Sequence, residues 1–360
     1  MVAGLRVSTV HNGSGRSVYR TWFSCASTVL LCAYFPGCLL FSAARAESVS
    51  IITALLQTET QSAVGLKKEG MAALRDGNYP GAVRLFVEAL TLNPNDPEST
   101  QFLNKAITDS GKPEAAIPVL EKALNSRPDQ DSIRFVLAQC YQHLDMDDKA
   151  VQTLQRSNSA LSHSPPWSFT TAFSLFRLGQ YDKAEALFRQ VMTVEEIRPA
   201  ASFFIGNCRF GKSDLAGSLP WYESAIRLGA KAQTPALNAY YYNYGLVLFR
   251  LNRFVDASSA FFEASSLNPS DPLAPYFLGR SQADSGQTQD AIAIFEKVVE
   301  AHPNFSPAYY QLGVMQKRAG NEVQAKSAFA KVGEIKKAEL ADQRLLGEMQ
   351  LGNGAAQENK

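Results

Sequence analysis

A ladder of single alanines constrains this chain more than any other feature. The rungs share a spacing of 34 residues and are Ala82, Ala116, Ala150 and Ala184, then, after an interruption, Ala257, Ala291 and Ala325. Ser218 takes the rung after Ala184, and a slip of five residues separates it from the second series. A fixed period in this size range indicates stacked supersecondary units, each of which buries its apolar face against its neighbours. The length of the chain therefore reflects the number of stacked repeats and does not indicate several globular domains.

Charge excludes one class of partner. The 360 residues carry a formal net charge of +1, and charged residues make up 19% of them. A nucleic-acid-binding protein normally has a basic stripe or patch, which this balance does not provide. We therefore expect no nucleic-acid partner.

The N-terminus has the features of an export signal. Arg6, Arg16 and Arg20 precede an apolar run from Trp22 to Phe41, and small residues flank Arg45 at Ala44 and Ala46. Basic, apolar and small-residue regions in this order are typical of a secretory signal peptide. We predict that residues 1–46 form a signal peptide cleaved near Ala46, which places the mature protein in the periplasm or outside the cell.

Two alternatives stay open for this segment. About 20 apolar residues can span a bilayer, so an uncleaved N-terminal membrane anchor is the first, although Pro36-Gly37 disfavours it. Lipidation at Cys38 is the second, and its flanking residues match a lipidation motif poorly. Contact with a membrane is expected only if the segment stays uncleaved.

The mature chain keeps two cysteines, Cys140 and Cys208, at the tenth place of two repeats. Packed helices lie about 10 Å apart, so thiols two repeats apart should be on the order of 20 Å apart. A disulfide needs Cα atoms within about 7 Å. We expect both cysteines to be small buried side chains.

From residue 63 the repeats follow one another almost without spacers. Repeats one to five occupy 63–232, an insert occupies 233–237, and repeats six to eight occupy 238–339. Most units have a small residue at position 8, alanine at 20 and a ring or leucine at 24, and four have proline at 32, as in Gly70, Ala82, Phe86 and Pro94 of the first. This pattern resembles the tetratricopeptide repeat family. The resemblance implies an all-α fold, a right-handed α-solenoid of about eight helix-turn-helix repeats.

The physical basis of the pattern is steric. Small residues let the two helices of a unit approach closely, the residue at 24 fills the gap beside them, and glycine or a polar residue near 15 ends the first helix. Repeat two departs from this at Asn104, where a small residue is expected. Pro118 and Pro220 fall inside second helices, where proline bends a helix. We predict a hinge at the insert, Gln233 to Leu237, between blocks of five and three repeats.

The segments outside the repeats complete the organisation. Residues 47–62 are expected to be an N-terminal lead or a capping helix. Residues 340–351 should form a capping helix over the last repeat, because the end of a solenoid needs a cover. Residues 352–360 should be a disordered tail.

The candidate binding surface follows from the resemblance, which implies that positions 2, 5, 6, 9, 12 and 13 of each first helix face a concave groove. The candidate residues for a peptide there are aromatic, amide or guanidinium side chains: Phe173, Arg177, Phe203, Asn207, Tyr242, Asn243, Arg250, Tyr276, Phe277 and Arg280. Rings serve as anchors, and an asparagine amide both donates and accepts hydrogen bonds. We expect about half of the rings to pack between repeats instead.

Catalysis finds little support in the sequence. Cys140 and His143 lie three residues apart on one helix, which gives only two ligands where zinc takes four. We predict no catalytic residue, no metal and no cofactor, and interpret the chain as a non-catalytic scaffold that binds a peptide or protein segment. The alternatives are a structural or assembly component of a cell-envelope complex and a substrate-recruiting partner of a separate enzyme. The oligomeric state is left open.

Overall fold

Each repeat of the sequence is a helical hairpin in this computed structural model, which describes residues 62–157 and 163–357, with side chains up to residue 340. Residues 62–75 are helical and pair with α3. The other first helices are α4 (Pro97–Ser110), α6 (Asp131–His143), α8 (Pro165–Arg177), α10 (Arg198–Gly211), α12 (Leu237–Arg250), α14 (Leu273–Asp284) and α16 (Ser306–Arg318). The second helices are α3 (Tyr79–Leu92), α5 (Pro113–Ser126), α7 (Asp147–Gln155), α9 (Tyr181–Gln190) with a short 3-10 turn η2 (Val191–Thr193), α11 (Leu215–Ala232), α13 (Phe254–Leu267), α15 (Thr288–Ala301) and α17 (Glu322–Gln357).

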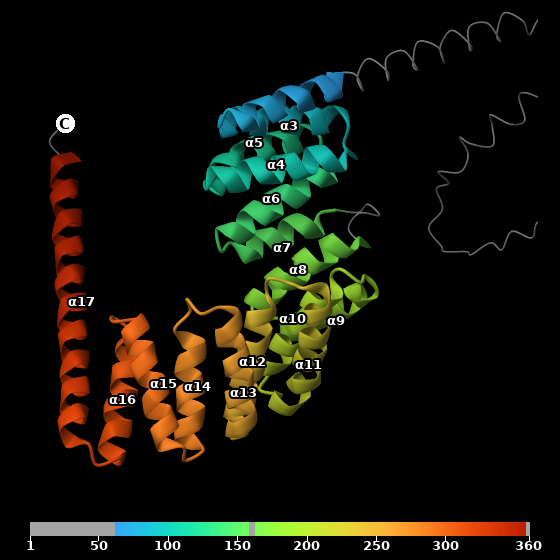
Figure 1. The fold of residues 1–360 in the computed structure, drawn as a ribbon. Coiled ribbons are helices and arrows are strands. Elements are labelled where there is room, and N and C mark those ends of the chain that lie inside the picture. The colour runs from blue at the N-terminus through green and yellow to red at the C-terminus, as the bar shows by residue number, and fades with distance from the viewer. Residues whose placement is uncertain (1–61, 158–162, 358–360) are drawn as a thin grey trace, which may run out of the picture.

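The hairpins stack in chain order. Figure 1 shows them as a curved solenoid in which neighbours in the sequence are neighbours in space. The described residues contain helices and turns but no strand. The predicted fold class, an all-α solenoid of helical repeats, is thus confirmed.

The turn inside each hairpin follows one rule. Position 15 has a positive φ in all eight described hairpins, whether glycine or a polar residue stands there: Gly77, Gly111, Asp145, Gly179, Ser213, Asn252, Gly286 and Gly320. The left-handed conformation ends the first helix and suits glycine, or short polar side chains, best. Each second helix then begins two residues later, at position 17.

The core of each hairpin is built on the pairing of positions 8 and 24. A Cβ added to Gly245 would lie 2.9 Å from the Phe261 ring, and one added to Gly279 would lie 2.8 Å from Phe295. Both rings are fully buried. Glycine is needed here because the ring at position 24 occupies the space of its missing side chain. The alanine ladder lies beside these rings, and all seven of its alanines are buried.

Stacking is continuous through the insert, which counts against a hinge between Gln233 and Leu237. Helix α11 has 18 residues where α13 has 14, so the second helix of repeat five is one turn longer and ends at Ala232, directly before the insert. Repeat five lacks the proline found near position 32 of repeats one, two, six and seven, so no proline stops its second helix there. Phe203 and Tyr240 stack across the junction with ring centroids 4.7 Å apart.

The C-terminal end also differs from the expectation. Helix α17 runs without interruption from Glu322 to Gln357, so a separate capping helix at 340–351 and a disordered tail from 352 are not seen. Repeat eight has Lys337 where proline ends four other repeats, and nothing stops the helix there. Residues 1–61, which include the predicted export signal and most of the predicted N-terminal lead, lie outside the described residues.

Candidate functional site

The ten candidate residues lie on four consecutive first helices, α8, α10, α12 and α14. Their shared placement follows from the repeat register, because each occupies one of the first thirteen positions of its unit. Their contacts divide them into rings, amides and guanidinium groups, which play different parts.

The rings join neighbouring repeats. Phe173 meets Phe204 of the next repeat at 5.3 Å between centroids, and Tyr242 meets Phe277 at 6.0 Å. Tyr276 lies 5.5 Å from Phe305, the last residue of its own repeat, which directly precedes α16. Together with Phe203, which stacks on Tyr240, all five candidate rings have an aromatic partner and are half-buried. The expected division into packing rings and binding rings is therefore absent, since each ring packs on one side and is partly accessible on the other.

The two asparagines are engaged within their own repeats. Asn207 Oδ1 accepts a hydrogen bond of 2.6 Å from the hydroxyl of Tyr222, the fully buried ring at position 24 of repeat five. Asn243 Nδ2 donates 2.9 Å to the carbonyl of Ala239, one turn earlier in α12. One end of each amide has a structural partner, and the role of the other end in holding a ligand backbone stays a prediction.

Arg177 is also occupied. Its Nε lies 2.9 Å from Oδ2 of the buried Asp147, another guanidinium nitrogen pairs with Asp145, and Nη1 donates 3.1 Å to the carbonyl of Gln142. These three partners belong to the hairpin turn of repeat three. Arg177 therefore ties two repeats together, which the sequence alone did not indicate.

Arg250 and Arg280, here called the arginine pair, differ from Arg177. The Cζ of Arg250 lies 4.6 Å from the centroid of Phe210, and that of Arg280 lies 5.0 Å from Phe249. Neither forms an ion pair with a carboxylate in the part of the chain that the structure describes. Stacking uses the flat face of a guanidinium and leaves its N–H edge free to donate.

A recurring contact explains how the position-13 arginines are placed. Arg177, Arg250 and Arg318 each reach the twelfth residue of the preceding repeat. In the first and third cases the partner is a carbonyl at the end of a first helix, where the helix dipole favours a cation. In the second it is the ring of Phe210. The signal in the sequence was arginine at position 13 of repeats four, six and eight.

The buried thiols are unsuited to chemistry. Cys140 and Cys208 are buried and free, as expected, and burial raises the pKa of each thiol to about 12. The thiolate, which is the nucleophile and the metal ligand, is then scarce at neutral pH. Among residues 62–157 and 163–357 no three side chains of histidine, cysteine, aspartate or glutamate cluster as a metal site. Nor is any helix in that part both long and apolar enough to cross a bilayer.

Comparison with known families identifies the type of repeat. Residues 75–157 and 109–191 match a family model described as anaphase-promoting complex, cyclosome, subunit 3. Residues 170–233 and 278–304 match two models described as tetratricopeptide repeat.

Individual relatives agree with these matches. TPR repeat-containing protein YpiA of Bacillus subtilis is 24% identical over 221 residues, which are 60% of this chain and 50% of that protein. Tetratricopeptide repeat protein 8 of Caenorhabditis elegans is 23% identical over 199 residues, 54% of this chain and 38% of that protein. The chain thus spans half or less of the length of these relatives.

A solved structure shares the fold. The C-terminal part of a TPR repeat-containing protein from Cytophaga hutchinsonii is 18% identical, with a TM-score of 0.54, over 66% of this chain and 94% of that one. The stacked hairpins define an α-solenoid of helical repeats. The family matches and the relatives show that these repeats are similar to tetratricopeptide repeats.

Proposed function

We propose that the protein is a non-catalytic interaction scaffold that holds an acidic peptide or protein segment on its first-helix surface, at the arginine pair. The observation that carries this proposal is the difference between Arg177, which has carboxylate partners within the chain, and Arg250 and Arg280, which have none among the described residues. A guanidinium held over a ring has lost rotamer freedom before a ligand arrives, which lowers the entropic cost of binding.

The half-buried rings around the arginine pair support the same surface. Phe249 and Phe277 both contact Arg280, and Phe277 also packs on Tyr242. Aromatic side chains beside an arginine are the composition in which binding energy concentrates at protein interfaces. The partner's carboxylates would accept hydrogen bonds from the guanidinium edges while its apolar groups contact the accessible sides of the rings.

The test is quantitative capture with the purified mature chain as bait and an envelope fraction as the source of partners. The double variant Arg250→Ala/Arg280→Ala should lose about tenfold or more in affinity for the captured protein, because hydrogen bonds to charged groups contribute about 1.5–3 kcal/mol each. Arg227→Ala, which removes an exposed arginine from the second helix α11, is the matched control and should capture as the native chain does. Capture by the double variant at native levels would contradict the proposal.

We also propose that the mature protein is exported, which Arg6, Arg16 and Arg20 before the apolar run support. N-terminal sequencing of protein isolated from cells should find a chain that begins after Ala46. A chain that keeps residues 1–46 and fractionates with membranes would replace this proposal with the anchored alternative.

A further inference from the structure

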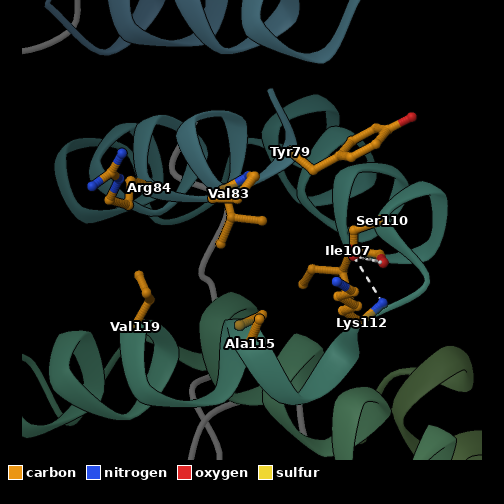
Figure 2. A pocket seen from close by; sticks show the side chains of 10 residues that line it. Tyr79, Val83, Arg84, Ile107, Ser110, Lys112, Ala115 and Val119 are labelled. Atoms are coloured by element: carbon orange, nitrogen blue, oxygen red, sulfur yellow. Dashed lines mark hydrogen bonds between the residues drawn. The ribbon is translucent and has the colours of Figure 1, made fainter. Parts of the chain in front are cut away.

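A cavity of about 390 Å³ lies between the second helices of repeats one and two, away from the first-helix surface. We call it the α3–α5 slot. Figure 2 shows Val83 pointing into it from α3, Ala115 and Val119 from α5, and Ile107 from α4. Its volume falls in the range of sites for small ligands, about 300–1,000 Å³.

Repeat two, which forms one side of the slot, departs from the close-packing rule. Position 8 holds Asn104, and position 24 holds Leu120 in place of a ring. Helices α4 and α5 consequently make much less contact than the two helices of repeats three to eight. An amide side chain cannot enter the gap that a glycine leaves open, so the pair splays and α5 leans toward α3.

The walls are apolar and offer a ligand few hydrogen bonds. Val83 and Ile107 are buried, with exposed fractions of 6% and 4%. The one hydroxyl in the lining besides Tyr79, that of Ser110, donates 2.6 Å to the carbonyl of Ile107 and accepts from the backbone N–H of Lys112. An extended peptide would leave its amides unpaired there, at a cost of about 1–3 kcal/mol for each buried group. An alkyl chain incurs no such cost.

The ends of the slot are cationic. Figure 2 places Arg84 at one end and Lys112 at the other, and both are exposed. Neither has an ion-pair partner among the described residues. Lys112 is also the N-cap residue of α5, which begins without a side-chain cap, so partial positive charge from the first helical turn adds to the ammonium group there.

We propose that the α3–α5 slot binds an amphiphile with one alkyl chain and one anionic head group, the chain between Val83 and Val119 and the head at Lys112. The apolar walls favour an alkyl chain, and the two cationic side chains favour a negatively charged head group. A second slot, of about 360 Å³ between α13 and α15, also has mostly apolar walls, but its lining adds the polar side chains of Ser265, Ser266 and His302 and has one lysine, so it is less suited to such a ligand. The proposal is independent of the arginine pair, which lies on the first helices of repeats six and seven.

The test uses dodecanoate as the probe, below the concentration at which it forms micelles, with titration calorimetry on the mature full-length chain. Dodecanoate should bind saturably with one site per chain, and dodecanol, which has the same chain without the charge, should bind more weakly. Ala115→Phe fills the slot from an exposed position and should weaken dodecanoate binding by about tenfold or more. Ala293→Phe, at an exposed alanine of α15 outside both slots, is the matched control and should bind as the native chain does.

A separate variant tests whether the anionic head group lies at Lys112. Lys112→Glu should weaken dodecanoate binding by about threefold to tenfold and leave dodecanol binding unchanged, because it reverses one exposed charge. This variant alters only a surface side chain, so it remains informative if Ala115→Phe unfolds. Absence of saturable dodecanoate binding, or native affinity in both slot variants, would overturn the proposal. Loss of binding in Ala293→Phe would equally overturn it.

Discussion

Repeats two and six have the same two-helix design, and they differ at the pair of positions that closes it. In repeat six, Gly245 lies against the fully buried ring of Phe261, and the two helices pack closely. In repeat two, Asn104 and Leu120 take those places, and the hairpin opens into the α3–α5 slot. The comparison teaches that the residue at position 8 governs how closely the two helices of one unit pack. A slot between second helices lies beside both units, as the one between α13 and α15 shows.

The largest expected effect comes from removing the ring of the closed repeat. Phe261→Ala should lower the free energy of unfolding by about 3–5 kcal/mol, because a fully buried phenylalanine leaves a cavity that its surroundings fill only in part. Urea unfolding followed by circular dichroism measures the change. Phe262→Ala is the matched control, since its side chain is 57% exposed, and should stay within about 0.5 kcal/mol of the native chain. Equal effects at 261 and 262 would refute the steric account.

The residue at position 8 can be replaced by valine in both repeats, and the two costs can be compared. Gly245→Val places its Cβ 2.9 Å from the Phe261 ring and should cost about 1–3 kcal/mol through overpacking. Asn104→Val, at the same position of the open repeat, should cost less than about 0.5 kcal/mol because the gap there already accommodates a larger side chain. Comparable losses in the two variants would show that the slot does not arise from position 8.

The open repeat depends on a polar contact at its start. Asp96 caps α4 through the backbone N–H of Glu98, accepts from Ser99, and pairs with Lys67 of repeat one at 3.0 Å. Burial alone would raise the pKa of Asp96, but the hydrogen bonds from Ser99 and Lys67 outweigh it and lower the pKa. A lowered pKa in the folded state means that the contribution to stability is present above the unfolded value, about 3.9, and is lost as pH falls through the folded value.

Asp96→Asn isolates that charge, because asparagine caps a helix about as well as aspartate. The variant should be less stable by about 1 kcal/mol at pH 7, and the difference from the native chain should vanish at acidic pH, below the folded pKa of Asp96. Denaturant unfolding of both chains at pH 7 and at a series of falling pH values measures this. A penalty that persists unchanged in acid would mean that the cap, and not the charge, is responsible.

The smallest expected effect is a gain in stability. Asn104→Ala restores the small residue of the repeat pattern and should stabilise the protein by about 0.5 kcal/mol, since alanine favours a helix more than asparagine does. Thermal unfolding should then shift upward, and the α3–α5 slot should bind dodecanoate less well if the hairpin closes. A loss of stability would mean that Asn104 makes a favourable contribution of its own.

The structure of the repeats could be predicted from the sequence. Positions 8, 15, 20 and 24 carry a steric rule that each unit obeys locally, so the hairpins and their register could be derived without coordinates. Asn104 was recognised as a departure, but the slot beside it depends on how far α5 leans toward α3, which no local pattern contains. The additional lengths of α11 and α17 are permitted by missing prolines, but α7 and α9 are short although their repeats lack the proline too, so this signal alone could not predict them.

The candidate site was less predictable because its side chains act across repeats. Asn207 and Arg177 look like ligand-binding residues in the sequence, and their partners, Tyr222 and Asp147, lie 15 and 30 residues away. Arg250 has the same position in its repeat as Arg177, yet its neighbour across the junction is a ring and not a carboxylate. Which guanidinium is free therefore depends on the identity of the residue at the adjoining turn.

The additional turn of α11 has a consequence for how such a chain can change in length. Four more residues advance a helix by about 6 Å and by a little over one full rotation, so the face that the helix presents is nearly restored. An insertion of this size at the outer end of a second helix can be absorbed without turning the first helices of the following repeats. A second helix of this solenoid can thus be lengthened by whole helical turns without changing the orientation of the first-helix surface that a partner would contact.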